Sequence, residues 1–433
     1  MNDVLRSGFD EFRRWVNPVA AERAQLTSEP IRLVRVIDGC TLADAEGTAY
    51  QDFLSGYGTQ ALGHRNPVVE AALREFLACD SPSFFPSGIS PYAGRLARLL
   101  GERTGYSSAS FASSGTEAVE AALKLARAAT GKPRILGLAG AYHGCTLGSL
   151  SLMQPGPFTD RFGPHLRGVE LLPFGDEQAL TQKLAVGDIA AVLVEPLQVE
   201  GGVRTLSPSY VETLCQRTAE QGALLIADEV QTGLGRTGRF LASAAWPRRA
   251  DVVVLAKALG GGLLPLSALL TDAAIFARAY GSIETAESHQ YTFAGNGLAC
   301  TAGIAALSQF TDELHAHVVA AGDRFRAALK DALSDSPLFL EVRGQGLLVG
   351  IALRDADHPW LSFAGLGLPE LANQPSVGLL LCHRLFRRGY LTHVCGHDWR
   401  VVRLQPPLSI SDDRLDEFVR VCQHELASLA NLL

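Results

Sequence analysis

Two short apolar runs in the middle of the chain each end on a side chain that can do chemistry. Ala223-Leu-Leu-Ile-Ala precedes Asp228, and Val252-Val-Val-Leu-Ala precedes Lys257. Continuous apolar runs of this length, bounded by polar or Gly-rich stretches, are typical of parallel strands buried on both faces of a sheet. Ligands bind outside the carboxyl ends of such strands, so we expect Asp228 and Lys257 to lie together at the edge of a site.

Helix and strand patterns alternate between about residues 67 and 311. Periodic apolar positions predict helices over 68–79, 92–102, 117–129, 208–221 and 297–311. Short apolar runs predict strands over 134–139, 168–173, 189–195, 223–228, 251–256 and 266–271. This alternation predicts an α/β domain built around a mostly parallel sheet.

The two ends of the chain have different patterns. We expect a helix and an irregular arm over 1–30 and an antiparallel hairpin over 31–54. After residue 311 we expect a long helix, strands within 339–353 and 399–404, a surface loop or cover over 355–378 with Trp360 and Phe363, and a last helix over 412–432. The predicted division is an N-terminal arm with part of a small domain (1–66), a large domain (67–311) and a C-terminal small α+β domain (312–433).

Composition excludes several classes of function. The net charge is -7, from 38 Lys and Arg against 45 Asp and Glu, and the absence of a basic block argues against nucleic acid as a partner. Eight scattered cysteines without a CxxC pair indicate reduced thiols rather than disulfides or a zinc site. Because neither a signal peptide nor an apolar stretch of about 20 residues is present, we expect no membrane segment and a cytoplasmic protein.

Lys257 is a candidate nucleophile. It precedes Ala258-Leu-Gly-Gly-Gly262, where missing side chains let a ligand approach the backbone. A lysine at a strand end is often a surface cap, but partial burial would lower the amine pKa and increase its nucleophilic free-base fraction. An amine beside a carboxylate at this position suggests pyridoxal phosphate held as a Schiff base.

Asp228 then has a role in this hypothesis as the partner of the cofactor ring nitrogen. The cofactor ring, kept protonated by Asp228, would accept the electrons released when the substrate Cα–H bond breaks. Gln231 could donate an amide hydrogen to the ring hydroxyl oxygen. The alternative for Asp228 is a structural ion pair with an arginine such as Arg236 or Arg239.

The phosphate would lie at a predicted helix N-terminus. Ser114, Gly115 and Thr116 precede or open the helix, whose unpaired N–H groups and dipole favour an anion. The alternative is a simple capping box formed by Ser114 and Glu117. Tyr142 follows a strand, where its ring could stack on a flat cofactor, and His143 could support the site from behind.

Taken together, these residues resemble the class III (ornithine/ω-amino acid type) aminotransferases of pyridoxal phosphate fold type I. The resemblance extends over most of the chain, from Tyr50-Gln-Asp-Phe to Arg403-Leu-Gln-Pro-Pro. Its motifs are Leu62-Gly-His-Arg-Asn-Pro67, Ser114-Gly-Thr-Glu, Tyr142-His-Gly, Glu195-Pro-Leu-Gln-Val-Glu-Gly-Gly202, Asp228-Glu-Val-Gln-Thr-Gly-Leu-Gly-Arg-Thr-Gly238, Ala256-Lys-Ala-Leu-Gly-Gly-Gly and Thr292-Phe-Ala-Gly-Asn.

The resemblance implies roles for individual residues. Lys257 would be the Schiff-base lysine and Asp228 the partner of the ring nitrogen. The ring would lie between Val230 and Tyr142, with Gln231 near its oxygen.

The resemblance also implies a homodimer with two shared sites. Gly115 and Thr116 would bind the phosphate together with Thr292 of the neighbouring subunit. Without the family context, an alternative for Thr292 is an N-cap of the helix that begins near Gly297.

For the substrate, the resemblance assigns Arg403 to a carboxylate and Glu200 to an ion pair that covers Arg403 when no carboxylate is bound. Tyr57 is a further candidate substrate contact.

The sequence therefore predicts a ping-pong aminotransferase that moves nitrogen from an amine or amino acid, including ω-amino compounds, to a keto acid or aldehyde. The alternatives are an amino-acid epimerase or racemase, an aminomutase or a decarboxylating aminotransferase on the same fold. A non-catalytic binding protein is a further alternative. A dinucleotide-binding enzyme is disfavoured because no strand-linked GxGxxG precedes a helix.

Overall fold

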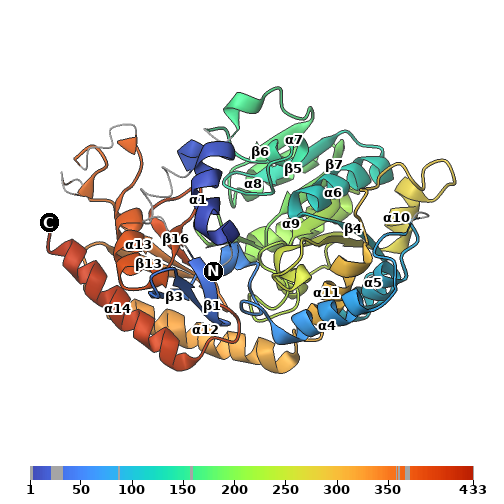
Figure 1. Cartoon of the computed structure of the whole chain (residues 1–433). Helices are drawn as coiled ribbons and strands as arrows, with labels where there is room; N and C mark the ends of the chain where they lie inside the picture. Colours follow the sequence, from blue (N-terminus) through green and yellow to red (C-terminus); the bar gives the residue numbers. More distant parts are fainter. Residues whose placement is uncertain are drawn as a thin grey trace.

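The structure, a computed structural model, describes residues 3–20, 33–85, 88–156, 159–356, 358, 361–365 and 371–432. Its centre is a seven-stranded sheet in the order β4-β12-β11-β10-β7-β5-β6 (Figure 1). Its strands are β4 (Ser108–Ala112), β5 (Arg134–Leu138), β6 (Val169–Leu172), β7 (Ile189–Val194), β10 (Leu224–Asp228), β11 (Val252–Leu255) and β12 (Ser267–Thr271). Only β12 runs against its neighbours, which confirms the predicted mostly parallel sheet.

Alternate residues of the central strands enter two separate apolar layers. Val252 and Val254 of β11 pack with the apolar face of helix α6 (Gly115–Thr130), whereas Val253 and Leu255 pack into the layer on the other face. All four side chains are fully buried. The two-sided burial explains why β11 reads as an uninterrupted apolar run rather than as an alternating one.

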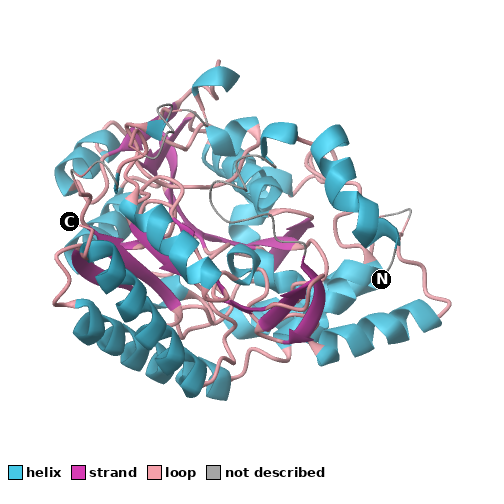
Figure 2. Ribbon diagram, turned by 60° about the vertical axis from the view of Figure 1, so that its left-hand side comes forward, coloured by secondary structure: helices cyan, strands magenta, loops and turns pink. Residues whose placement is uncertain are grey.

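Helices lie on both sides of this sheet (Figure 2). In the central region they are α4 (Pro67–Ala78), α5 (Pro91–Thr104), α6, α7 (Leu147–Leu150), α8 (Glu177–Leu184), α9 (Pro208–Glu220), α10 (Ala273–Tyr280) and α11 (Gly297–Leu307). The end segments of the chain contain α1 (Asp3–Trp15), α12 (Asp312–Leu333), α13 (Val377–Arg387) and α14 (Asp412–Ala430), of which α12 and α13 contact the strands of the smaller sheets. The short element α3 (Ser55–Gly58) is a left-handed turn rather than an α-helix. No helix in the described ranges is long and apolar enough to cross a membrane.

The N-terminal and C-terminal segments share a sheet. Strands β1 (Leu33–Asp38), β2 (Thr41–Asp44) and β3 (Ala49–Asp52) are extended by β15 (Tyr390–Leu391), which pairs in parallel with β3. A third sheet has the order β13-β14-β17-β16, from Phe339–Gln345, Leu348–Leu353, Val401–Leu404 and His393–Val394. The short strands β8 (Leu197–Gln198) and β9 (Arg204–Thr205) pair with each other. The pairing of β15 with β3 supports a small domain built from both termini. The domain boundaries at 66 and 311 stay a prediction.

The segment expected to be a surface loop or cover is partly built into the core. Leu361 and Phe363 are buried, and the Phe363 ring lies 5.9 Å from the ring of Trp399 in an edge-to-face arrangement. Trp360 and the arm over 21–32 lie outside the described residues.

Candidate active site

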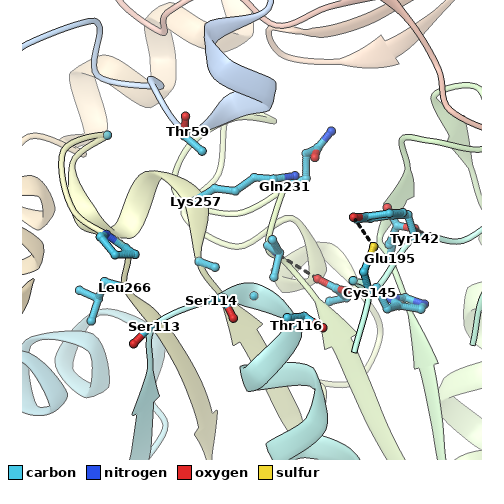
Figure 3. A pocket seen from close by; sticks show the side chains of 18 of the residues that line it. Thr59, Ser113, Ser114, Thr116, Tyr142, Cys145, Glu195, Gln231, Lys257 and Leu266 are labelled. Carbon is cyan, nitrogen blue, oxygen red and sulfur yellow. Dashed lines mark hydrogen bonds and ion pairs between the residues drawn. The ribbon is translucent and has the colours of Figure 1, made fainter. Parts of the chain in front are cut away.

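A cavity of about 540 Å³ opens at the carboxyl ends of β10 and β11. Asp228 and Lys257 both line it, as does Gln231. Figure 3 shows the Lys257 and Gln231 side chains in this cavity, with Tyr142 and Cys145 on another of its walls. The two neighbouring strands therefore bring the carboxylate and the amine to one site, at the edge that the strand order requires.

Lys257 begins a short turn, Lys257–Gly260, directly after β11, and its backbone has a φ of 45°. A left-handed φ is unfavourable for a residue with a side chain, and residues held in this conformation cluster at active sites. Burial lowers the pKa of the Lys257 amine to about 8. About a tenth of this amine is therefore uncharged at pH 7, far more than for an ordinary lysine, and this fraction is nucleophilic.

Asp228 is buried and accepts two hydrogen bonds. Its Oδ2 lies 2.7 Å from His143 Nδ1, and its Oδ1 accepts the Val230 N–H at 3.0 Å. The alternative ion pair with Arg236 is wrong, because Arg236 donates instead to the carbonyls of Leu347 and Pro406. Arg239 is likewise not a partner of Asp228 among the described ion pairs.

Glu195 belongs to the same cavity, although the sequence analysis gave it no role. Its two oxygens accept the N–H groups of Tyr142 at 3.0 Å and Val199 at 3.3 Å. Burial raises the pKa of Glu195 to about 7. The signal was present in the sequence, because Glu195 directly follows the apolar strand β7, much as Asp228 closes β10.

The N-terminus of α6 also lines the cavity through Ser113, Ser114, Gly115 and Thr116. The capping box is present: Ser114 Oγ accepts the Glu117 N–H, and Glu117 Oε2 accepts the Ser114 N–H at 2.9 Å. The Thr116 hydroxyl lies 2.7 Å from the hydroxyl oxygens of both Thr146 and Ser149. The hydroxyls of Ser114 and Thr116 thus both have partners within the protein. The backbone N–H groups of the first helical turn are therefore the donors for an anion.

Glycines let two chain segments approach this helix end. A Cβ on Gly144 would lie 2.4 Å from Thr116 Cβ, and one on Gly115 would lie 3.1 Å from Val230 Cγ1. Any side chain at these two positions would push the Tyr142–Gly144 loop or the Val230 wall away from the helix N-terminus. The cavity therefore depends on Gly115 and Gly144 for its shape.

The polar atoms of the cavity fit pyridoxal phosphate. Gln231 Nε2 and His143 Nε2 are buried and have no hydrogen-bond partner among the described residues. Leaving such atoms unpaired costs free energy unless a ligand or water completes them. Together with the helix N-terminus, the buried amine and the buried carboxylate, they match a flat, polar, anionic cofactor that carries an aldehyde. No group of three potential metal ligands occurs in the described part of the chain.

Arg403 lies on β17, is 1% exposed and forms an ion pair with Glu200. Burial is the largest single influence and opposes the charge of both groups. The attraction and hydrogen bond between them, together with the Gly396 N–H and the Lys257 charge near Glu200, outweigh it, so the pKa of Arg403 is raised and that of Glu200 is lowered. The second Glu200 oxygen accepts the Gly396 N–H at 2.7 Å. Glu200 lines the cavity, so it is the member of this pair that faces a substrate.

Tyr57 also belongs to this cluster. The Arg403 guanidinium carbon lies 4.9 Å from the centroid of the Tyr57 ring, a cation–π contact. Tyr57 and Arg403 are 346 positions apart in the sequence, and the fold brings them into contact.

Thr292 is exposed and lies outside the cavity that contains Lys257 of the same chain. It lines a second cavity of about 650 Å³. Its interpretation as a helix N-cap is wrong, because α11 is capped by Asn296, whose side chain accepts the Ala299 N–H at 2.8 Å.

The cavity wall also contains Gly144, Ala256 and Gly262, which belong to the sequence motifs quoted above, as well as Ser113, which precedes Ser114, and Thr59, which belongs to the segment around Tyr57. Two further parts of the wall were not predicted from the sequence, Cys145 and the segment 263–266. The last of these follows the Gly-rich turn after Lys257, and its position beside the lysine was the available signal.

Comparisons with known proteins agree on one family. The model for aminotransferase class-III matches residues 24–426. The chain is 34% identical to a putrescine aminotransferase from Pectobacterium atrosepticum, over 96% of this chain and 88% of that protein. It is 32% identical to the aminotransferase PigE from a Serratia species over 95% of this chain, and it spans 52% of PigE.

Solved structures give the same answer for the fold. An ornithine aminotransferase from Toxoplasma gondii has a TM-score of 0.85 at 28% identity, covering 98% of this chain and 95% of its own. An amine transaminase from an uncultivated Pseudomonas species, solved with pyridoxal phosphate bound, has a TM-score of 0.81 at 28% identity, covering 92% of this chain and 95% of its own.

The fold and the cavity define a pyridoxal-phosphate-dependent enzyme of fold type I. The chain belongs to the class III aminotransferases. The predicted family, fold class and cofactor are confirmed.

Proposed function

We propose that this chain transfers an amino group from an amine or amino acid, including ω-amino compounds, to a keto acid or aldehyde in two half-reactions at the cavity around Lys257. The single observation that carries this proposal is a buried lysine with a lowered pKa beside a buried aspartate at the ends of adjacent strands. Pyridoxal phosphate, when bound, supplies the electron-withdrawing ring that makes the substrate Cα–H bond acidic.

In this proposal Lys257 has two tasks. Its amine would condense with the cofactor aldehyde with loss of water, and once displaced by the incoming amine it would move the proton from the substrate carbon to the cofactor carbon. Burial supports both tasks, because the lowered pKa leaves a free amine that can attack a carbonyl or accept a proton.

The remaining residues orient the cofactor. Asp228, held by His143, keeps a proton on the ring nitrogen. Gln231 Nε2, which is buried and without a partner among the described residues, would donate to the ring hydroxyl oxygen, and Val230 and Tyr142 would cover the two ring faces. The N–H groups at Gly115 and Thr116 bind the phosphate, with the neighbouring hydroxyl of Ser114 fixing the helix end.

The substrate carboxylate binds to Arg403. Arg403 Nε is buried and has no partner among the described residues, so its guanidinium keeps one donor for a carboxylate in addition to the group paired with Glu200. Glu200 covers Arg403 while an amine without a carboxylate reacts, and moves aside when the keto acid binds. Tyr57 lies beside this position.

The test is to mix the cofactor-loaded enzyme with single amino donors. An aminotransferase converts one equivalent of cofactor to the pyridoxamine form and then stops until pyruvate is added. Continued turnover of an amino acid without a keto acid would instead show an epimerase, racemase or aminomutase. Release of carbon dioxide from the donor during formation of the pyridoxamine form would show a decarboxylating aminotransferase, and no spectral change with any donor would favour a binding protein.

We further propose a homodimer in which Thr292 completes the partner's phosphate site. Thr292 is exposed and lies outside its own chain's cavity, which supports a role across an interface. Lys257→Ala and Thr292→Asp chains should each be inactive alone. Mixed dimers should regain one intact site, whereas a chain that carries both substitutions should not complement a chain that carries either one.

A further inference from the structure

Two sequence motifs remain without a role after the cofactor and substrate sites have been assigned. They are Tyr50-Gln-Asp-Phe and Leu62-Gly-His-Arg-Asn-Pro67. In the structure their polar members meet, because His64 Nε2 lies 2.7 Å from Asp52 Oδ2. The Asp52 side chain is 4% exposed and that of His64 is 14% exposed. Burying a carboxylate costs free energy unless it is paired, so a buried Asp52–His64 pair is expected to serve a structural or functional role.

The other oxygen of Asp52 holds the backbone of the next turn. Asp52 Oδ1 accepts the N–H of Leu54 at 2.9 Å and the N–H of Ser55 at 2.7 Å. One carboxylate therefore fixes where the chain leaves β3, and His64 fixes the carboxylate.

The turn that follows is left-handed over four consecutive residues. Ser55, Gly56, Tyr57 and Gly58 have φ values of 49°, 55°, 60° and 89°. Glycine adopts these values readily, but Ser55 and Tyr57 are L-residues with side chains, for which they are unfavourable. Such a backbone persists only where the surrounding contacts hold it.

This turn lies next to both Arg403 and Lys257. The Tyr57 ring covers the Arg403 guanidinium, with 4.9 Å between the ring centroid and the guanidinium carbon. A Cβ on Gly58 would lie 3.9 Å from Lys257 Cδ. Next along the chain, Gln60 Nε2 donates to the Gly262 carbonyl at 2.8 Å, which ties the end of the turn to the loop after Lys257.

We propose that Asp52, supported by His64, is a positioning residue for the substrate carboxylate. By holding the left-handed turn it keeps the Tyr57 ring on the flat face of Arg403. With that face covered, the guanidinium presents its edge, where paired N–H groups can bind both oxygens of a carboxylate. This role rests on the proposed function of Arg403. The Tyr57 ring held over Arg403 makes the site selective for acceptors that carry a carboxylate.

The test compares two acceptors on enzyme loaded with pyridoxamine phosphate. Pyruvate has a carboxylate and benzaldehyde has none. In the wild type both should regenerate the pyridoxal form; if neither does, the proposed function itself fails, independently of Asp52.

The Asp52→Ala variant should raise the half-saturating concentration of pyruvate by about tenfold or more, with a change below about threefold in the limiting rate and in the reaction with benzaldehyde. Tyr57→Leu should give the same pattern. The double variant should resemble the single variants rather than their product, because Asp52 acts through Tyr57. Equal losses with both acceptors, or fully multiplicative effects in the double variant, would overturn the inference.

Asp44→Ala is the matched control. Asp44 also accepts turn N–H groups, from Glu46 at 3.1 Å and Thr48 at 2.8 Å, but in the hairpin before β3. Asp44→Ala should leave the reactivity with pyruvate relative to that with benzaldehyde unchanged. If Asp52→Ala does not fold, His64→Asn and Asp52→Asn provide milder changes of the same contacts, and either must shift the pyruvate-to-benzaldehyde ratio in the same direction for the inference to stand.

Discussion

His143 Nδ1 lies 2.7 Å from Asp228 Oδ2, and both side chains are buried beneath the cavity that contains Lys257. The imidazole orients the carboxylate, while the Val230 N–H holds its other oxygen. Asp228 can therefore point one fixed, charged oxygen at a cofactor ring nitrogen, which a freely rotating carboxylate would do poorly.

Replacing this charge while keeping its shape should remove most activity. We expect Asp228→Asn to lower the rate of amine-dependent cofactor conversion by at least about 100-fold, because a neutral amide cannot hold the ring nitrogen protonated. Stopped-flow absorbance measures this rate, and the thermal midpoint should change little.

The matched control is the adjacent Glu229, which is also buried but accepts N–H groups from Ala242 and Ser243 instead. Glu229→Gln should lower stability more than it lowers the rate of the folded enzyme. Equal rates for Asp228→Asn and the wild type would contradict the assignment.

The Glu200–Arg403 pair predicts opposite effects on the two half-reactions. Glu200→Gln removes the charge that a keto acid must displace, so the half-saturating pyruvate concentration should fall by about 3–10-fold. An amine donor without a carboxylate should react more slowly, because Arg403 is then left buried and uncompensated. Separate half-reaction kinetics measure both effects; equal changes in the two would rule out the gate.

The lowered pKa of Lys257 predicts the pH dependence of cofactor binding. Only the free amine attacks the aldehyde, so the rate of pyridoxal phosphate incorporation into the apoenzyme should rise with pH and level off above about 8 rather than above the ordinary lysine value of 10.5. The rise of the bound-cofactor absorbance measures this rate. A rate that keeps climbing to pH 10 would contradict the buried environment of the amine.

The same group affects stability with a definite sign. Between pH 8 and 10.5 the unfolded chain binds more protons at Lys257 than the folded chain does, so its contribution to the free energy of unfolding of the apoenzyme increases with pH across this window.

Glu195 predicts the opposite trend at lower pH. Its pKa is raised from 4.5 to about 7 by burial, so the folded chain binds the additional proton and stability falls as pH rises through this interval. Glu195→Gln removes the titration and should flatten that part of the profile. Urea unfolding of both apoproteins at pH 5, 6 and 7.5 tests this, and parallel profiles would show that Glu195 does not titrate there.

The sequence was sufficient for features set by local pattern and strand order. Asp228 and Lys257 could be placed together because each ends a doubly buried strand and parallel strands end at one edge. The helix N-terminus at Gly115 was readable from its capping box. Strand β4 was missed because Ser-Ala-Ser-Phe-Ala has no run of β-branched residues, and its pairing with β12 supplies the structure instead.

Features set by long-range contacts could not be predicted in this way. The His143–Asp228 contact joins residues 85 positions apart. The left-handed turn at Tyr57 depends on Asp52, His64 and the ring contact with Arg403, and no local rule places a tyrosine at a positive φ. The short helices α8 and α10, eight residues each, were also missed, since so few turns give little periodic signal.

The most direct test of the central claim is reduction of the cofactor-loaded enzyme with sodium borohydride, followed by peptide mass spectrometry. The account predicts a single pyridoxyl phosphate adduct on Lys257, absent from Lys257→Ala. An adduct on a different lysine, or none despite stoichiometric bound cofactor, would contradict it.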